Sequence, residues 1–567
     1  LPVLMISMAY ALSSYMVGYC WNVMWLDAIM IFPIVMMGLE DLIDRKDGRL
    51  YCFALFYALY CNYYIAFMIC IFVVIWYILY SFKSVKQFFF RGIAFTFYSF
   101  LAAGMAAIML IPAYLGIKQT ASGESMSLPE HSFLTNAADL LNRQFAMWTP
   151  ITHDNFDGNV NLYIGIFTVL AVVLYLLNSK IKISEKIKKV LLIGFFYLSF
   201  SEMILNFIWH GFHDQYGIPN RFSFLFGFVL LYMLWEVFEN LEGTKGWHIA
   251  LACMAGVGLL VYARAKGTNP LDDEVYGVAG MLFILYGMLL FLYTLSRKRK
   301  GWYKNAFCIV ALIEIVATAF MGFNENGQIA VPKFFYGVND MEKAVASLGD
   351  KTFYRSELAS SLIVDENALY PINGVGLFGS TASDSMVNLM DNLGFYTGCN
   401  EYLYKGATPV TNLLLNVKYL YYHQEDTLNT DFEYVKREGA FNIYKNPARE
   451  MSMGYLMNLS VEDWDSESAY PFRVQNSLGK QAFGVSELFH NVEIADPATN
   501  GCTASKTNDG EYYFEYKSTQ ADNMVFTIPV TKTIDDLYLF YDGTQVENAQ
   551  ITIDGTNVKS GDLDGYM

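Results

Sequence analysis

The sequence predicts an α-helical membrane domain that crosses the bilayer many times, followed by a region outside the membrane with an α/β part and a β-sandwich part. Hydrophobic residues make up 54% of the 567 residues and the mean hydropathy is +0.29, yet the formal net charge is −16. Long apolar runs fill the chain up to Asn324, and nearly all of the excess acidic residues follow it. A hydrophobic part and an acidic part are therefore joined end to end.

The apolar runs define the membrane spans. A hydrocarbon core of about 30 Å requires roughly 17 to 25 apolar residues per helix. The second and third runs are short, and we expect them to be tilted, broken or re-entrant. The sequence predicts about eleven spans in residues 1–322, at 1–18, 28–42, 50–62, 63–82, 92–115, 161–178, 190–208, 222–238, 248–264, 277–295 and 304–322.

The acidic region divides into two predicted domains. Residues 323–446 alternate helical patterns, at 340–348 and 383–393, with strand-like runs that include 352–358, 418–422 and 432–444, which is typical of an α/β domain. Residues 447–567 show the two-residue alternation of strands, for example at 511–516 and 524–530. We expect a β-sandwich there, which either binds carbohydrate or has a structural role.

The loop charges predict the orientation of the chain. Lys and Arg in short loops stay on the cytoplasmic side of a membrane. One alternating set of loops carries most of these residues, and the opposite set carries few. This bias places the C-terminal region, the segment around Asp27, the loop 116–160 and the loop 209–221 outside the cell. We therefore expect a multi-pass bacterial cell membrane protein whose C-terminal region is extracytoplasmic. The basic residues are Arg45, Lys46, Arg49, Lys83, Lys86, Arg91, Lys180, Lys182, Lys186, Lys188, Lys189, Lys245, Arg297, Lys298, Arg299, Lys300 and Lys304.

The ends of the chain suggest a fragment. The sequence opens at Leu1 without a methionine or a basic signal region, already within an apolar run, and it stops soon after strand-like segments. We expect further sequence on both sides, including an N-terminal span and the first outer loop.

Polar and aromatic residues gather in the predicted outer loops, whereas the inner loops are merely basic. An enzyme acting on a lipid-linked sugar phosphate needs a cation for the phosphate, a carboxylate as base or metal ligand, and aromatic walls. The outer loops contain all of these types. The candidate site residues are Asn22, Trp25, Asp27, Asn62, Tyr63, Tyr64, His210, Asn220 and Arg221.

Arg221 is the best candidate for binding a phosphate. It follows Asn220 at the mouth of the 222–238 span, where a guanidinium forms two parallel hydrogen bonds to a phosphate. The alternative is that Arg221 only extends toward the membrane surface or pairs with a loop carboxylate.

Asp27 is a candidate catalytic residue. It would orient the acceptor hydroxyl, or hold a divalent cation together with an acidic residue upstream. The alternative is an N-cap for the span that begins at Ala28. Asn22 and Trp25 are either part of a donor pocket or anchors in the membrane interface.

Other chemistries find little support. His210, His213 and Asp214 have the composition of a metal site, but Gly211 and Pro219 indicate a loop, and we predict no metal there. Neither a phosphate-binding Gly-x-x-x-x-Gly-Lys-Ser/Thr loop nor a Gly-x-Ser-x-Gly nucleophile elbow occurs. An acidic half excludes nucleic acid as an expected partner. Glu202 and Glu314, within spans, would line a proton path or serve helix packing.

Several segments together resemble the bacterial YfhO family, from residue 1 to roughly 450. The string 22–27, Asn-Val-Met-Trp-Leu-Asp, is the most specific. The other segments are 10–15, 38–40, 62–68, 161–165, 219–224 and 417–420. This resemblance implies similarity to the GT-C glycosyltransferases. Such enzymes carry a key acidic residue in the first outer loop, which would lie upstream of Leu1, so the main catalytic acid is expected to be missing from this chain.

The resemblance implies transfer of a sugar from a polyprenyl-phosphate carrier to a cell-wall polymer such as lipoteichoic acid. The second hypothesis is a transporter or flippase for a lipid-linked sugar or wall precursor. A transporter should show polar residues through the membrane midplane and at both faces. In this sequence the polar residues gather at one face, which favours the enzyme.

Overall fold

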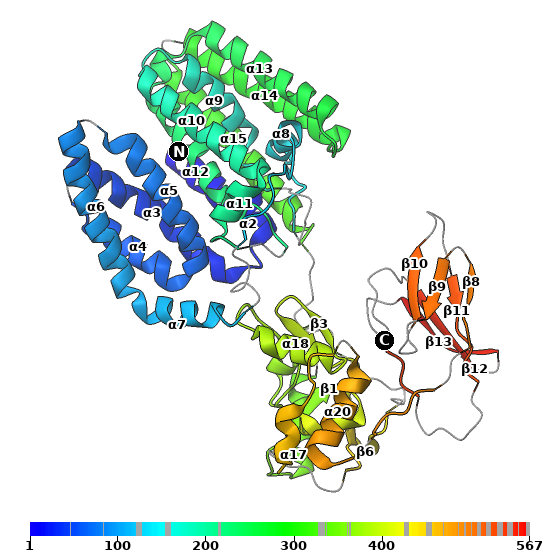
Figure 1. Cartoon of the computed structure of the whole chain (residues 1–567). Helices are drawn as coiled ribbons and strands as arrows, with labels where there is room; N and C mark the ends of the chain where they lie inside the picture. Colours follow the sequence, from blue (N-terminus) through cyan, green and yellow to red (C-terminus); the bar gives the residue numbers. More distant parts are fainter. Residues whose placement is uncertain are drawn as a thin grey trace. The chain divides into compact units, whose positions relative to one another are not determined.

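A computed structural model describes the fold of the chain (Figure 1). The chain divides into two compact units, Leu1–Ala330 and Val331–Met567, which are described separately. The structure describes residues 1–562 except 46, 83, 121–126, 153–159, 214–216, 297, 327–334, 336, 360, 362–363, 424–429, 449–455, 469, 486, 493–494, 501, 507–511, 517–522, 530–536, 541–547 and 554.

The first unit is helical. Six of its described helices are long and apolar enough to cross a membrane: α3 (Val23–Arg45), α5 (Tyr63–Ser81), α6 (Val85–Met105), α13 (Gly246–Lys266), α14 (Asp273–Leu295) and α15 (Lys300–Phe323). The others are α1 (Pro2–Ala11), α2 (Ser14–Tyr19), α4 (Arg49–Cys61), α7 (Ala107–Ile117), α8 (Ala137–Phe145), α9 (Ile166–Leu177), α10 (Ile183–Ser201), α11 (Met203–Trp209), α12 (Ser223–Glu239) and the 3-10 turn η2 (Leu241–Gly243).

Three predicted spans are interrupted, so the expectation of one continuous helix in each was wrong. The run 1–18 breaks at Ser13, whose side chain caps α2, and the run 92–115 breaks at Ala106 between α6 and α7. The run 190–208 breaks at Glu202, which has extended backbone and accepts a hydrogen bond from Leu205 N at 2.8 Å. The Glu202 carboxylate therefore has a structural role as the cap of α11.

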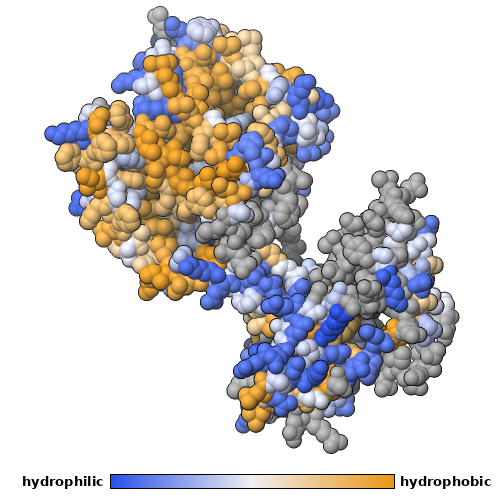
Figure 2. Space-filling view, in the orientation of Figure 1, coloured by the Kyte–Doolittle hydropathy of each residue, from blue (hydrophilic) through white to orange (hydrophobic). Residues whose placement is uncertain are grey.

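The surface of the helical unit is apolar over wide areas (Figure 2). Helix α6 illustrates this, because only Arg91 and Ala102 on it are buried, while Phe90, Phe97 and Phe100 are 65%, 60% and 74% exposed. Exposed aromatic side chains on this scale suit a helix that faces lipid rather than water.

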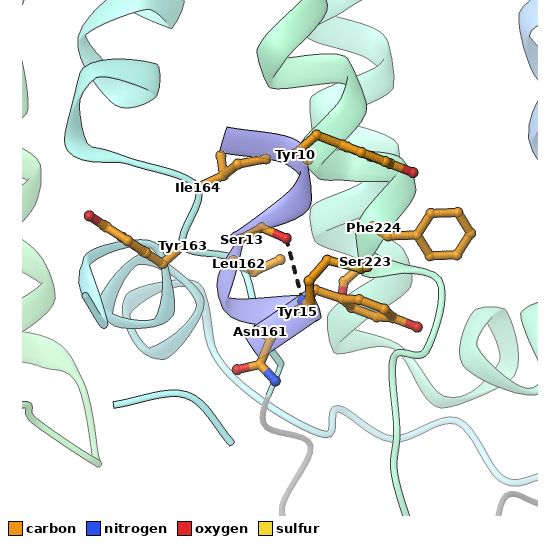
Figure 3. Close-up of a pocket in the computed structure, with 11 residues that line it drawn as sticks. Tyr10, Ser13, Tyr15, Asn161, Leu162, Tyr163, Ile164, Ser223 and Phe224 are labelled. Carbon is orange, nitrogen blue, oxygen red and sulfur yellow. Dashed lines mark hydrogen bonds between the residues drawn. The ribbon is translucent and has the colours of Figure 1, made fainter. Parts of the chain in front are cut away.

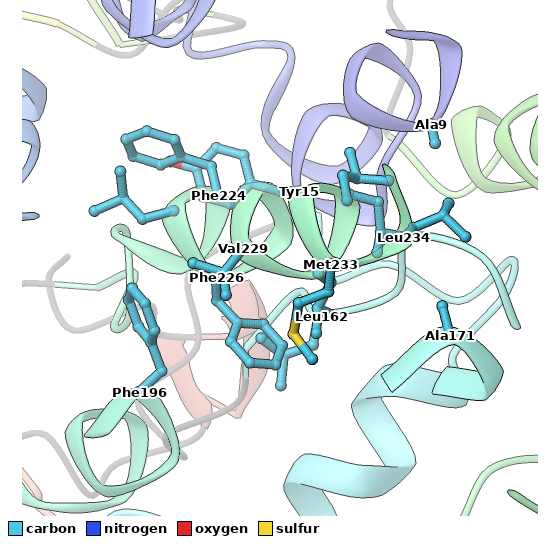
Figure 4. Packing of buried hydrophobic residues seen from close by; sticks show 14 of the residues in the cluster. Ala9, Tyr15, Leu162, Ala171, Phe196, Phe224, Phe226, Val229, Met233 and Leu234 are labelled. Carbon is cyan, nitrogen blue, oxygen red and sulfur yellow. The ribbon is translucent and has the colours of Figure 1, made fainter. Parts of the chain in front are cut away.

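Helix α12 lies at the centre of the apolar core (Figure 4). Most of its residues are buried, and its rings contact the surrounding helices. Phe224 packs against Tyr15 of α2 with the ring centroids 5.6 Å apart, and Phe226 packs against Phe196 of α10 at 5.8 Å. The start of α12 is therefore held on several sides by aromatic contacts.

Glu314 joins three parts of the helical unit. Its carboxylate on α15 accepts hydrogen bonds from Tyr163 Oη at 2.7 Å, from the backbone N–H of Ile166 at 2.6 Å and from the Tyr286 hydroxyl of α14. Three donors satisfy a carboxylate buried among helices. This supports the helix-packing interpretation of Glu314 over a proton path.

A second polar cluster, the Lys189 cluster, joins four helices at the end of the unit where the basic loops lie. Lys189 of α10 is fully buried, with Nζ 2.6 Å from Tyr80 Oη and 3.6 Å from a Glu236 carboxylate oxygen. The same ammonium lies 4.7 Å from the Trp76 ring and 4.3 Å from the Tyr232 ring. Tyr232 Oη in turn donates to Glu40 of α3 at 3.0 Å. This cluster holds together α3, α5, α10 and α12.

The second unit begins with a mixed α/β region, as predicted. Its four-stranded sheet has the order β1 (Arg355–Leu358), β5 (Val417–Tyr422), β7 (Phe441–Lys445) and β6 (Glu433–Glu438). Strand β1 is parallel to β5, and the other neighbours are antiparallel. Met341 of α17 (Val338–Leu348) packs against Tyr421 and Phe441 of this sheet.

A smaller sheet, a set of helices and three strand pairs make up the rest of the described part of the second unit. The sheet has the order β2 (Leu377–Phe378), β4 (Glu401–Leu403) and β3 (Tyr396–Gly398). The helices are α18 (Asp384–Asn392), α19 (Pro409–Leu414), α20 (Pro471–Phe483), η3 (Glu366–Leu369) and η4 (Leu459–Asp463). The pairs are β8 (Ala498–Asn500) with β11 (Asn523–Val525), β9 (Cys502–Lys506) with β10 (Tyr512–Tyr516), and β12 (Asn548–Ile553) with β13 (Thr556–Asp562).

The expectation that the chain is all-β from residue 447 was wrong for 471–483, which form α20. Val474 of this helix packs against Met390, Leu393 and Phe395 of the α/β region. Gln475 binds Thr408 and the Leu393 carbonyl, so α20 belongs with that core. The described strands after residue 497 form antiparallel pairs, and the sandwich itself remains a prediction.

Candidate functional site

Arg221 and the starts of three helices form the candidate site. Trp25 lies in the first turn of α3, Tyr64 is the second residue of α5, and Arg221 lies two residues before the first residue of α12. The guanidinium carbon Cζ of Arg221 is 5.6 Å from the Trp25 ring centroid and 5.2 Å from that of Tyr64. The far ends of α3 and α12 lead to Arg45 and Lys245, so the site lies at the end of the unit away from these basic residues.

The backbone before α12 fixes where Arg221 points. Asn220 adopts the left-handed conformation with a φ of 59°, which Asn tolerates better than most residues. Arg221 Nε donates to the Ile218 carbonyl at 2.9 Å, and the Arg221 carbonyl accepts from Tyr15 Oη at 2.8 Å. These bonds hold both the main chain and the planar head group of Arg221, which is half-buried.

Two histidines join this group through the Tyr64 ring. The ring centroids of His210 and His213 lie 6.2 Å and 5.9 Å from that of Tyr64, on which Arg221 also lies. The set Trp25, Tyr64, His210, His213 and Arg221 is called the Arg221 cluster below.

His210 is fully buried and held in one tautomer. Its Nδ1 lies 2.7 Å from the Asn206 carbonyl oxygen, which accepts and cannot donate, so Nδ1 carries the ring proton. Burial, and then the neighbouring charge of Arg221, lower the pKa of His210 to about 3. The imidazole is therefore neutral, and its Nε2 is a hydrogen-bond acceptor.

Asn206 links His210 to the backbone turn before Arg221. Its Nδ2 donates to Asn220 Oδ1 at 2.5 Å, and Asn220 Nδ2 donates to the Phe200 carbonyl at 3.5 Å. Asn206, His210 and Asn220 are all buried. This chain of bonds connects α10, α11 and the start of α12.

The structure brings together five of the predicted site residues: Trp25, Tyr64, His210, Asn220 and Arg221. Asn62 instead caps α5, accepting from Ile65 N at 2.9 Å and donating to the Met24 carbonyl at 3.0 Å. Tyr63 is the half-buried first residue of α5, and Asn22 is buried immediately before α3. Both flank the cluster.

Asp27 lies apart from the cluster. Helix α3 begins at Val23 rather than at Ala28, so Asp27 is in the second turn and the N-cap interpretation was wrong. Two residues along an α-helix correspond to about 200° of rotation, which turns Asp27 away from the side on which Trp25 meets Arg221. The side chain of Asp27 is exposed, and Tyr57 of α4 is near it.

Metal ligands do not gather in the described part of the chain, where no group of three or more His, Cys, Asp or Glu residues is suited to hold an ion. Asp214, the third residue of the predicted histidine motif, lies outside the described residues. Within the Arg221 cluster, the guanidinium is the group that suits an anion.

Tyr15 and Asn206 belong to the site but were not among the predicted residues. Tyr15 supports the Arg221 main chain and also lines a small cavity between α2, the segment 161–164 and the start of α12 (Figure 3). Ser223, two residues after Arg221, lines the same cavity. The spacing of Asn206 and His210, four residues apart, would have indicated one face of a helix.

The arrangement suits recognition of an anionic group at a membrane surface. A cation held between two aromatic faces is oriented and partly shielded from water, which strengthens its interaction with an anion. The aromatic rings also provide walls for an apolar chain or a sugar face.

Comparison with protein families identifies the family of the chain. The family model described as bacterial membrane protein YfhO matches residues 1–565, which extends beyond the resemblance expected up to about residue 450. Comparisons with curated proteins and with solved structures found no match. The chain belongs to the YfhO family of bacterial membrane proteins.

Proposed function

We propose that this protein is a membrane glycosyltransferase that moves a sugar from a polyprenyl-phosphate carrier to a cell-wall polymer such as lipoteichoic acid. The reaction takes place at the outer face of the bacterial membrane, where the loop charges put the Arg221 cluster. The partners are the lipid-linked sugar donor, the polymer acceptor and the bilayer.

The position of Arg221 carries this proposal. Its guanidinium lies 5.2 Å and 5.6 Å from two aromatic ring centroids at the start of α12, a helix buried in the core of the unit. A lipid-linked phosphate reaches the start of α12 because its polyprenyl chain stays in the bilayer. Arg is suited to the task, since its planar fork binds two phosphate oxygens at once and keeps its charge when partly buried.

The role of Arg221 in the reaction is electrostatic. As the bond between the sugar and the phosphate breaks, negative charge accumulates on the leaving phosphate. A guanidinium already fixed by Ile218 and by the flanking rings stabilises that charge without reorganising. Removing one such donor typically lowers a rate by about 10²–10³-fold.

Two buried clusters argue for the enzyme over the transporter. A transport path needs polar groups along the membrane midplane. The carboxylate of Glu314 is satisfied by Tyr163, Ile166 and Tyr286, and the Lys189 cluster holds four helices together at the basic end. Both groups are engaged in packing between helices, so neither supports a transport path.

The test is the fate of the lipid-linked sugar in cells that carry Arg221→Ala. A transferase without its phosphate ligand should accumulate the donor in the outer leaflet, whereas a transporter should deplete it there. Arg264→Ala is the matched control, because Arg264 lies 5.7 Å from the Tyr276 ring and pairs with Asp273 at 2.7 Å on the same predicted side. Donor depletion in the Arg221→Ala cells would refute the enzyme.

A further inference from the structure

Two acceptor atoms are buried beside Arg221 without a donor. His210 Nε2 and Asn206 Oδ1 are inaccessible to solvent, and no described residue donates a hydrogen bond to either. Leaving a buried acceptor unsatisfied is costly, so such atoms are expected to serve a ligand or an ordered water.

The hydrogen-bond chain assigns both atoms as acceptors. The main-chain carbonyl of Asn206 accepts a hydrogen bond from Nδ1–H of His210, so Nε2 carries a lone pair and no proton. The Phe200 carbonyl accepts from Asn220 Nδ2, so the Asn220 oxygen faces Asn206 and must receive a proton from Asn206 Nδ2. The remaining Asn206 atom, Oδ1, is therefore also an acceptor.

The two atoms come from the same side of α11, one from a residue within the helix and the other from its C-cap, His210. Residues 206 and 210 are four apart, so their side chains are neighbours, about 5–6 Å between Cβ atoms. His210 meets the Tyr64 ring on which Arg221 lies, and Asn206 binds the residue before Arg221. Two hydrogen-bond acceptors, which suit the O–H or N–H groups of a ligand, therefore lie beside the Arg221 guanidinium, which suits a phosphate.

We propose that His210 Nε2 and Asn206 Oδ1 recognise the sugar of the donor through its hydroxyl or amide N–H groups. In a sugar linked to a phosphate, such groups lie within a few bonds of the phosphate. Acceptors beside Arg221 therefore suit a ligand that has both. This inference rests on the proposed function and assigns sugar recognition, as distinct from phosphate binding, to the 206–210 face of α11.

Substituting asparagine or glutamine at position 210 distinguishes the role of Nδ1 from the role of Nε2. The amide of His210→Asn occupies the place of Nδ1 and keeps the bond to the Asn206 carbonyl, but has no group at Nε2. His210→Gln places its amide near Nε2 instead. A structural role for His210 predicts that Asn is the better substitute, whereas sugar recognition predicts that Gln is.

The experiment measures binding to the full chain in lipid nanodiscs. The ligands are decaprenyl phosphate and its glucosyl, galactosyl and N-acetylglucosaminyl derivatives. In the wild type at least one sugar should increase the affinity over decaprenyl phosphate alone. In His210→Asn the affinity for the sugar derivative should be about tenfold lower than in the wild type, the size expected for one hydrogen bond. His210→Gln should retain part of the gain in affinity.

His248→Asn is the matched control. His248 is also buried, and its Nδ1 accepts from the Lys245 N–H at 3.1 Å at the start of α13. This variant should bind every ligand as the wild type does. A sugar-dependent gain that is unchanged in His210→Asn, or absent for every sugar in the wild type, would overturn the inference.

These outcomes are distinguishable from failure of the proposed function. Phosphate binding is read from decaprenyl phosphate alone, and it should depend on Arg221 in every variant at position 210. If Arg221→Ala bound decaprenyl phosphate as the wild type does, the proposed function would fail instead.

Discussion

The Lys189 cluster provides the most quantitative test of the fold. Lys189 is fully buried, and its partner Glu236 has 22% of its side chain exposed, with 3.6 Å between the charged atoms. Lys189→Met fills the same space with an apolar chain but leaves Glu236 without its cation. Breaking one side of a buried ion pair costs about 3–5 kcal/mol, and because Glu236 is partly exposed we expect about 3 kcal/mol of unfolding free energy.

Lys180→Met is the matched control. Lys180 pairs with Glu242 at 2.8 Å, but the two side chains are 51% and 68% exposed. An exposed pair contributes about 0–1 kcal/mol, so the control should lose less than about 1 kcal/mol. The double variant Lys189→Met with Glu236→Gln should regain most of the loss, because it removes both charges.

Reversible unfolding of the full chain in mixed detergent micelles measures these free energies. The double-mutant cycle isolates the coupling between Lys189 and Glu236. Equal losses in Lys189→Met and Lys180→Met, or no recovery in the double variant, would refute the burial of this pair and the helix arrangement that creates it.

Three further predictions follow from other contacts. Trp25→Leu and Tyr64→Leu each remove one aromatic face from Arg221, and each should weaken decaprenyl phosphate binding roughly fivefold, equivalent to a cation–π contact of about 1 kcal/mol; unchanged titration curves would contradict the placement of the guanidinium. Burial raises the pKa of Asp350, but hydrogen bonds from Lys418 and Thr352 outweigh this effect and hold the pKa well below its usual range. Its contribution to stability is therefore present above the ordinary Asp pKa of about 3.9 and is lost as the pH falls through the lower folded value. The hydrogen-exchange protection factors of β1 and β5 in the full chain, which correct for the slower intrinsic exchange at lower pH, should decrease on acidification, and Asp350→Asn should reduce this dependence. The same acid response of the protection factors in both proteins would contradict the prediction. Asp27→Asn should leave decaprenyl phosphate binding and the melting temperature unchanged, because Asp27 is exposed and caps no helix; a changed affinity in either direction would place Asp27 at the phosphate site.

Much of the helical unit was predictable because apolar runs of sufficient length have few alternatives in a membrane. The breaks were not predictable from hydropathy. Ser13 and Glu202 interrupt apolar runs by capping the next helix, an interaction that depends on local backbone geometry. In the second unit, α20 has a polar sequence, and it is a helix because Val474 and Gln475 fit a core made by residues far away in the chain.

The candidate site was predictable in composition but not in arrangement. Arg221, Trp25 and Tyr64 were identified because such residues are costly or distinctive beside apolar spans. The start of α3 determines that Trp25, and not Asp27, faces Arg221. This helix begins at Val23, five residues before the expected Ala28. The contribution of Asn206 depends on a bond to Asn220 across two helices, which no local pattern indicates.

The central claim is that Arg221 holds a lipid-linked phosphate during sugar transfer to a wall polymer. The most direct test is the sugar content of purified lipoteichoic and wall teichoic acids from cells with the intact gene, a deletion, Arg221→Ala or Arg264→Ala. We predict that one sugar is lost in the deletion and in Arg221→Ala, while the polymer is still made and Arg264→Ala resembles the wild type. Unchanged polymers in all four strains would contradict the proposed transferase.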